Sequence, residues 1–439
     1  MTSAILPPPD TGTGNHPDDR PGNRTADRPR TARQRNLLGA HLVDSLGSGL
    51  LLAFTVVWFA RTTTLGLPAI GAAITLARLL ALPTAILIGP LIDRHGPRRI
   101  AAAANLLSAL AHTAFLTAHQ TWQIVAVVAL AQIGTAAYWT ASTGLVVLAS
   151  HPEDRPRWFA LIGALRNGGL ALGGAAGALL LALGGTTGLR ATVLGNAASF
   201  ALAAVLLATW RPLNTPATGR TGRTGPHGGY RRVLRDGRYL LLVAVNLSFV
   251  FASLVLSLLL ALYLTEGLHQ QAWLAGSLLV LNSAQIVLTQ SAVTRRLEHL
   301  RPTRVIAAGS LLNVLAFALF ALLAAAPGWA AVAGAHLAML VYNLAETVAS
   351  PYSEELSVRL ADPAQRGRYL AVYQLSWTVG QAVAPWLLTL LLARGPVWPW
   401  VLLGALSLAA VPALLLLERL GAPGAGDGVR AVGDGAGQP

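Results

Sequence analysis

Four charged residues lie within long apolar stretches of this 439-residue chain: Asp44, Arg78, Arg166 and Glu346. A charge in a hydrocarbon environment is costly, and residues of this kind commonly mark proton relays or solute pathways. The chain contains no cysteine, which excludes disulfides, thiolate metal ligands and cysteine nucleophiles. The chemistry open to these four side chains is therefore proton transfer, charge pairing and the binding of a charged solute.

Asp44 is the residue that we expect to carry a proton. It lies in the stretch LVDSLGSGLLL, three residues after His41, and a helix would place both side chains on one face. A carboxyl group in a partly dry cavity can bind and release a proton near neutral pH. The alternative role for Asp44 is that of a fixed partner in a structural ion pair.

Arg166 is the expected partner of Asp44. Both lie about 12 Å inside their apolar stretches, measured from the same side at about 1.5 Å per helical residue. Because an unpaired buried charge is costly, we expect the two side chains to pair, with Asn167 completing the site. Protonation of Asp44 would break such a pair, which offers a switch.

Arg78 and Glu346 each allow two interpretations. Arg78, near the middle of its stretch, would either hold an anionic group of a solute or balance a buried acid. Glu346, with Asn343 one turn earlier and Pro351 loosening the expected helix end, is a second acid for proton or cation binding. For both residues the alternative is a structural partner.

Uncharged polar and aromatic residues at the same depth would line an amphipathic cavity. Gln374, Trp377 and Gln381 recur at helical spacing, so they share one face. The alternative for each is helix packing or anchoring at a membrane interface, and His112 and His336 are expected to be packed rather than ligating. Besides Arg78 and Asn167, the candidates for substrate contact are Tyr138, Trp139, Asn246, Asn282, Gln285, Asn343, Tyr373, Gln374, Trp377 and Gln381.

Twelve apolar segments carry these residues. The chain is 54% apolar and 11% charged, whereas soluble domains carry about 25% charged residues. Each segment has roughly the 20 residues that span a bilayer core, and the continuous runs do not fit a β-barrel. The expected transmembrane helices are 36–60, 66–92, 98–118, 122–149, 158–183, 188–210, 239–264, 272–293, 304–326, 329–352, 367–392 and 397–418.

Arginine falls mainly in alternate gaps between these segments. Of the 32 basic residues, all arginine, 27 lie in the two tails and in every second gap, while Arg61, Arg190 and Arg394 lie in the other gaps. This distribution predicts a membrane protein with both termini in the cytoplasm. The net charge of +14 then faces anionic lipid rather than nucleic acid, because no aromatic-interleaved basic patch is present.

The longest internal polar stretch, 211–238, divides the apolar region into 36–210 and 239–420. It contains NTPATGRTGRTGPHGG, a flexible linker. An all-α membrane fold of two six-helix bundles, related by pseudo-two-fold symmetry, is typical of transporters with a midplane cavity. Residues 1–35, which lack the apolar run of a signal peptide, and 421–439 are expected to be disordered cytoplasmic tails.

Glycine recurs at four-residue spacing in the fifth segment, at Gly169, Gly173 and Gly177. A glycine stripe lets two helices approach closely. It predicts either a static packing face or a surface on which the two halves slide.

A motif follows the second segment: Gly89-Pro-Leu-Ile-Asp93-Arg94-His-Gly96-Pro-Arg98-Arg99. It resembles the signature of the major facilitator superfamily, G-x-L-x-D-R-x-G-x-R-R, in both its residues and its place between helices 2 and 3. The resemblance implies that Asp93 acts as a conformational latch against the start of helix 11, here Arg366-Gly-Arg-Tyr369. The corresponding second-half segment, Val293 to Arg301, lacks the aspartate–glycine pair, so we expect an asymmetric latch.

The resemblance covers about 36–420 and implies a bacterial inner-membrane secondary transporter. We expect proton-coupled efflux of a small amphipathic compound, with membrane lipids as surroundings and a monomer as sufficient unit. The alternatives are an uptake symporter for a polar solute and a non-transport enzyme or scaffold. No G-x-x-x-x-G-K-[ST], H-E-x-x-H or G-x-S-x-G motif occurs, so we expect no cofactor, no metal and no enzymatic activity.

Overall fold

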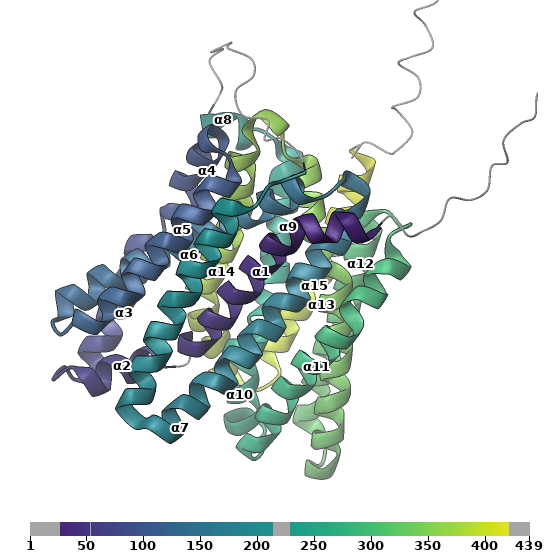
Figure 1. Ribbon diagram of the computed structural model, residues 1–439. Coiled ribbons are helices and arrows are strands. Elements are labelled where there is room, and N and C mark those ends of the chain that lie inside the picture. Colours follow the sequence, from purple (N-terminus) through teal and green to yellow (C-terminus); the bar gives the residue numbers. More distant parts are fainter. Residues whose placement is uncertain (1–26, 53, 214–228, 421–439) are drawn as a thin grey trace, which may run out of the picture.

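The structure, a computed structural model, describes residues 27–52, 54–213 and 229–420, and these are almost entirely helical (Figure 1). Most of the expected tails, 1–26 and 421–439, and the linker residues 214–228 lie outside the described residues. Helix α1 begins at Asp27. The helix therefore starts within the expected N-terminal tail, 1–35.

The N-terminal part, residues 27–213, contains seven α-helices among its described residues, and several of them match the predicted segments closely. They are α1 (Asp27–Leu52), α2 (Thr55–Thr62), α3 (Leu67–Ala81), α4 (Thr84–His95), α5 (Pro97–Ala114) continued by η2 (Phe115–Thr117), α6 (Thr121–Ala149), η3 (Pro152–Asp154) and α7 (Arg155–Thr209).

The C-terminal part, residues 229–420, starts with a short helix that lies within the predicted linker 211–238. Its elements are α8 (Gly229–Val233), α9 (Gly237–Ser253), η4 (Val255–Leu259), α10 (Leu260–Leu262), η5 (Tyr263–Gly267), α11 (Ala272–Leu297), α12 (Pro302–Leu322) with η6 (Leu323–Ala325), α13 (Gly328–Leu360), η7 (Pro363–Gln365), α14 (Arg366–Arg394) and α15 (Trp398–Arg419).

Proline and glycine explain where helices break. Helices α3 and α4 meet at an angle of 41° around Pro83, which has no backbone N–H to donate. In α7 the backbone of Gly185 is non-helical (φ 52°, ψ −124°), and Gly188 packs against the backbone of Leu180, so the chain turns back there. The two predicted segments 158–183 and 188–210 are the two arms of α7.

Pro351 does not end its helix, which corrects the predicted end at residue 352. Helix α13 continues through Pro351 to Leu360. A proline removes one helical hydrogen bond, but tertiary packing can hold the helix together. The added turns bring Glu354 and Glu355 into the helix, and the sequence analysis left both out.

Eight helices among the described residues are long and apolar enough to cross a membrane, or up to ten if each bent pair counts as one span. Each part of the chain has cores of its own: the clusters around Phe59 and Tyr138 contain only residues before 213, and those around Trp400 and Tyr352 only residues after 229. A fifth cluster joins the two parts through Val146, Val147, Phe159, Ile162, Val358 and Leu370.

Candidate functional site

A cavity of about 510 Å³ lies between the N-terminal and C-terminal parts. Its walls come from α1, α2, α3, α5, α6 and α7 on one side and from α9, α13 and α14 on the other. A volume of this size suits a small organic molecule. Ten predicted residues line it: Arg78, Trp139, Arg166, Asn167, Asn246, Glu346, Tyr373, Gln374, Trp377 and Gln381.

The cavity wall is amphipathic. Phe159, Phe200 and Phe249 add aromatic surface to Trp139 and Trp377. Polar groups that the sequence analysis did not select are interspersed among them, and they include Ser48, Gln132, Thr135, Ser142, Asn196, Ser350 and Ser353. His112 also lines the cavity and is packed as expected, stacked on Phe200 with 5.2 Å between ring centroids.

The predicted polar face of α14 does face the cavity. Gln374, Trp377 and Gln381 all line it. Beside them, the Tyr373 hydroxyl donates to Asn246 Oδ1 at 2.8 Å, and Asn246 Nδ2 donates to Ser376 Oγ at 2.6 Å. These hydrogen bonds fix the orientation of Asn246 and Tyr373 between α9 and α14.

Arg166 lies over an aromatic ring. Its guanidinium carbon is 4.5 Å from the centroid of Trp139, a cation–π geometry. The carboxylates of Glu346, Glu354 and Asp44 stabilise its charge. No ion pair between Arg166 and Asp44 within 4.0 Å occurs in the part of the chain that the structure describes, so the predicted direct pair is not formed here.

Asp44, His41 and Tyr138 form a buried group that is not part of the cavity lining. Their exposed fractions are 3%, 2% and 2%. Tyr138 OH and His41 Nδ1 are hydrogen-bonded at 2.8 Å, while Asp44 Oδ1 and His41 Nε2 have no hydrogen-bond partner. Tyr138, predicted as a substrate contact, therefore does not line the cavity in this structure, and its hydroxyl is hydrogen-bonded to His41 of α1.

Glu354 is the functional candidate that the sequence analysis missed. It lines the cavity eight residues after Glu346 and accepts a hydrogen bond from Thr143 Oγ1 of the N-terminal part at 3.1 Å. Eight residues make about two helical turns, so both carboxylates lie on one face of α13. The two adjacent glutamates are evident in the sequence just after Pro351, but the helix was predicted to end at residue 352, so Glu354 was not selected.

Three predicted substrate contacts belong instead to a packing network between α11 and α13. Asn282 Nδ2 donates to Asn343 Oδ1 at 2.7 Å, and Asn343 Nδ2 donates to Gln285 Oε1 at 3.0 Å. Gln285 Nε2 in turn donates to the carbonyl oxygen of Leu340 at 3.0 Å. None of the three lines the cavity, because amide side chains in apolar helices satisfy each other across the interface.

Asp93 joins the two parts of the chain at the N-terminus of α14. Its Oδ1 accepts from the backbone N–H of Gly367 at 2.6 Å, and its Oδ2 accepts from Arg368 Nη1 at 3.0 Å. A helix N-terminus offers unpaired N–H groups and a positive dipole, so a carboxylate is stabilised there. Helices α4 and α8 lie together at this end of the bundle (top of Figure 1), where the Tyr230 hydroxyl donates to the carbonyl oxygen of Ile86.

Two glycines allow α4 and α14 to approach closely where Asp93 binds. A Cβ added at Gly367 would lie 2.6 Å from Asp93 Oδ1 and would overlap the carbonyl oxygen of Gly89. A Cβ at Gly89 would lie 3.0 Å from the Cβ of Ala371. The α4 and α14 backbones therefore touch directly where Asp93 binds.

The remaining motif residues shape the loop. Gly96 has φ 82°, a left-handed conformation that favours glycine, and it separates α4 from α5. Arg98 Nη1 donates to the carbonyl oxygens of Ala208 and Trp210 at 2.9 Å each, which ties the loop to the end of α7. Arg94 and Arg99 are exposed at this arginine-rich end.

A second contact joins the two parts at the segment Val293 to Arg301, which lacks the aspartate–glycine pair of the motif. Arg157 donates to both carboxylate oxygens of Glu298, from Nε at 2.5 Å and from Nη2 at 2.6 Å. The hydrogen bond from Arg157 lowers the pKa of Glu298 below its ordinary value of 4.5. The contact differs chemically from that of Asp93, since no helix N–H takes part.

The glycine stripe packs within the N-terminal part. A Cβ at Gly169 would lie 2.9 Å from the Cβ of Ser45, and a Cβ at Gly173 would overlap the carbonyl oxygen of Leu46. A Cβ at Gly177 would lie 2.5 Å from the carbonyl oxygen of Leu50. The stripe thus holds α7 against α1 within the N-terminal part, as expected of a packing face, and it does not face the C-terminal part.

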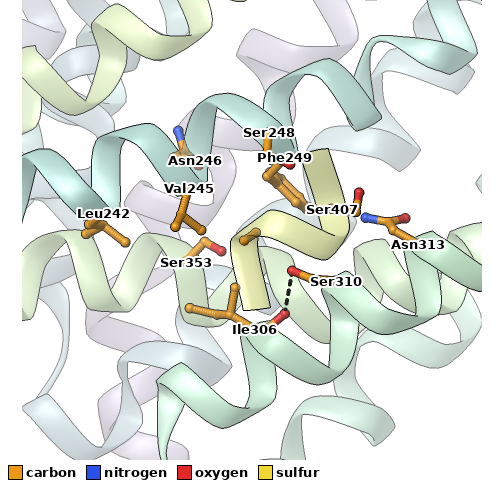
Figure 2. A pocket seen from close by; sticks show the side chains of 11 residues that line it. Leu242, Val245, Asn246, Ser248, Phe249, Ile306, Ser310, Asn313, Ser353 and Ser407 are labelled. Carbon is orange, nitrogen blue, oxygen red and sulfur yellow. Dashed lines mark hydrogen bonds between the residues drawn. The ribbon is translucent and has the colours of Figure 1, made fainter. Parts of the chain in front are cut away.

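A second, much smaller cavity of about 10 Å³ lies inside the C-terminal part, among α9, α12, α13 and α15 (Figure 2). Polar groups surround it, and the Ser310 hydroxyl donates to the carbonyl oxygen of Ile306 at 3.0 Å. Asn313 Oδ1 has no partner. The volume suits about one water molecule and is too small for a solute. Within the described residues no three His, Asp or Glu side chains gather to hold a metal ion.

Sequence relatives extend over most of the chain. It is 24% identical over 384 residues to the multidrug resistance protein MdtH of Photorhabdus laumondii, covering 86% of this chain and 88% of the relative. It is 23% identical over 400 residues to MdtH of Escherichia coli, covering 88% and 95%.

Solved structures share the fold. The human organic anion transporter MFSD10 superposes with a TM-score of 0.69 at 18% identity, covering 88% of this chain and 99% of that one. FucP in its outward conformation also gives 0.69, at 15% identity, covering 88% and 97%. The family model described as Major Facilitator Superfamily matches residues 37–361, which is well over half of the chain. With the loop motif bound to α14 as described above, the chain belongs to the major facilitator superfamily.

Proposed function

We propose that this transporter exports small amphipathic compounds from a bacterial cell in exchange for protons. The observation that carries the proposal is the cavity of about 510 Å³ between the two parts, which combines aromatic walls with few charges. Curated relatives named as multidrug resistance proteins, from bacteria, support efflux. We place the protein in the inner membrane as a monomer.

The topology we propose has twelve crossings in two six-helix bundles, 36–210 and 239–420, with both termini in the cytoplasm. The eight individual spans become twelve when the second arm of α7, the two bent pairs and the segment from α9 through η5 are each given one crossing. The arginine-rich end then faces the cytoplasm.

Alternating access gives the proposed transport cycle. The hydrogen bonds and ion pairs described above between the two parts lie at or near the arginine-rich end, at Asp93, Arg157, Tyr230 and Glu354. With this end cytoplasmic, the structure corresponds to a state closed toward the cytoplasm. Breaking these contacts while the opposite ends approach would expose the cavity to the cytoplasm.

A proton-release assay in inverted vesicles tests the proposal. With an inward-acidic gradient imposed, amphipathic compounds should trigger dissipation of the gradient by the wild type and not by Asp44→Asn. Release that survives in the variant would move the coupling proton to Glu346 or Glu354. No release with any compound would contradict proton-coupled efflux and favour the uptake alternative, which solute accumulation in right-side-out vesicles would show.

A further inference from the structure

Arg166 lies in a place suited to an organic cation. Its guanidinium covers the face of Trp139 at 4.5 Å from the ring centroid, and the carboxylates of Glu346 and Glu354 stabilise its charge. All four side chains line the cavity. An aromatic face beside two carboxylates is a cation site by its chemistry, and here the protein's own arginine fills it.

A further carboxylate that could hold the guanidinium lies on α1, at Asp44. Gly169, one turn after Arg166, packs against Ser45, the residue after Asp44, where an added Cβ would lie 2.9 Å from the Ser45 Cβ. Asp44 and Arg166 therefore lie at one level on touching helices. Asp44 is buried and its Oδ1 has no hydrogen-bond partner.

We propose that Arg166 is an internal stand-in for a cationic substrate. The cationic group of the substrate displaces the guanidinium from Trp139, Glu346 and Glu354, and the guanidinium then pairs with the Asp44 carboxylate. This inference rests on the proposed efflux function, and it names the class of substrate as organic cations with an apolar body. It also names Arg166 as the residue that sets their affinity.

The exchange conserves buried charge. An unpaired buried carboxylate costs several kcal/mol, so without substrate Asp44 is best kept as the neutral acid. When Arg166 arrives, the O–H bond of Asp44 breaks, its proton leaves to water and the carboxylate pairs with the guanidinium. One positive charge enters as substrate and one leaves as a proton, so binding of the cation and loss of the proton favour each other.

Other titratable groups facing Arg166 do not replace Asp44 in this role. Tyr138 and His41 are hydrogen-bonded to each other at 2.8 Å, and Glu354 accepts from Thr143. Glu346 and Glu354 line the cavity together with Arg166, so departure of the guanidinium leaves them for the substrate. Asp44 alone among the three acids gains a partner when Arg166 moves.

The experiment compares two probes of one shape and opposite charge, tetraphenylphosphonium and tetraphenylborate. Binding to the full chain in nanodiscs is followed by tryptophan fluorescence, since Trp139 and Trp377 line the cavity. Arg166→Gln should bind the phosphonium roughly 2- to 30-fold more tightly than wild type, the range expected for removing a competing cation–π contact. Arg166→Lys keeps a cation and should stay near wild type.

Matched controls and a proton count separate this role from a structural one. Arg190→Gln removes an exposed arginine from the same helix and should not change phosphonium affinity. In weakly buffered solution, wild type should release about one proton per bound phosphonium, while Asp44→Asn and Arg166→Gln should bind without release. Wild-type affinity should therefore rise with pH, and that of both variants should not.

Three results would overturn the proposal. The first is that folded Arg166→Gln binds the phosphonium no more tightly than wild type does. The second is that wild type binds the borate more tightly than the phosphonium. The third is that wild type binds neither probe. Efflux itself can survive each of them, because the vesicle assay with neutral amphipathic compounds does not depend on a cation site. Loss of compound-triggered proton release in those vesicles would instead contradict the function on which this inference rests.

Discussion

Gly367→Ala should open the arginine-rich end of the transporter. The added Cβ would lie 2.6 Å from Asp93 Oδ1 and would overlap the Gly89 carbonyl oxygen, so α4 and α14 must separate by about an ångström or more to relieve the overlap. That separation stretches both hydrogen bonds of Asp93, which are 2.6 and 3.0 Å long. The backbone N–H itself is kept by alanine, so the effect is steric.

The expected magnitude follows from those two bonds. A hydrogen bond to a charged group contributes about 1.5–3 kcal/mol, and the partial exposure of Asp93 and Arg368 favours the lower value. Loss of both then costs the closed state about 3 kcal/mol. At 1.4 kcal/mol per factor of ten, the ratio of closed to open molecules should fall by about 100-fold.

Distance measurement between spin labels can detect this change. The chain has no cysteine, so His95→Cys and Ala364→Cys, both at exposed positions on opposite sides of the contact, can be labelled without further substitutions. Gly367→Ala should move the distance distribution to longer values. Gly276→Ala, where an added Cβ meets nothing within 4 Å, is the matched control. A distribution for Gly367→Ala equal to that of the parent would refute the reasoning.

Three further predictions concern packing and charge. Gly173→Ala should lower the thermal stability of the detergent-solubilised protein by the equivalent of about 1–3 kcal/mol, because the added Cβ overlaps the backbone of α1. A Cβ added at Gly163 meets open space, so an equal loss of stability in Gly163→Ala would contradict this prediction. Asn343→Ala should lower the free energy of unfolding by about 1 kcal/mol and leave substrate affinity unchanged in a binding assay. A large loss of affinity would instead show that Asn343 contacts the substrate. The Arg157 contact with Glu298 should persist at neutral pH and be lost only as pH falls through the lowered pKa of Glu298. Arg157→Gln should therefore change the label distances at pH 7, by no more than an energy of about 1 kcal/mol would produce, and this change should shrink as pH falls through that pKa.

Hydrophobic blocks predicted the positions of most helices well, because a membrane demands apolar lengths and leaves little freedom in where they begin. The loop motif also predicted the right contact: Asp93 does bind the start of α14. Helical spacing within one segment was sufficient to predict that Gln374, Trp377 and Gln381 share a face, and the three line the cavity together. These predictions depend on local sequence or on a motif with a defined partner.

Predictions that needed the relation between helices succeeded less well. Asn343 and Tyr138 have the right polarity and depth for substrate contacts, but which side of a helix meets the cavity depends on the rotation set by its neighbours. The amide of Asn343 and the hydroxyl of Tyr138 found partners on adjacent helices instead. Glu354 was missed because a proline was taken as a helix end, although packing of α13 carries the helix past it.

The contacts at the arginine-rich end also constrain the proposed cycle. The apolar cluster that joins the two parts has six buried side chains, each worth about 1.5–3 kcal/mol when fully buried. Their complete exposure would cost about 9–18 kcal/mol, which exceeds the contribution of the Asp93 hydrogen bonds. An open state can be populated only if closure of the opposite ends buries comparable apolar surface. Polar contacts such as those of Asp93 and Glu298 therefore cannot hold the end closed alone; they adjust by a few kcal/mol a balance that apolar burial sets on both sides.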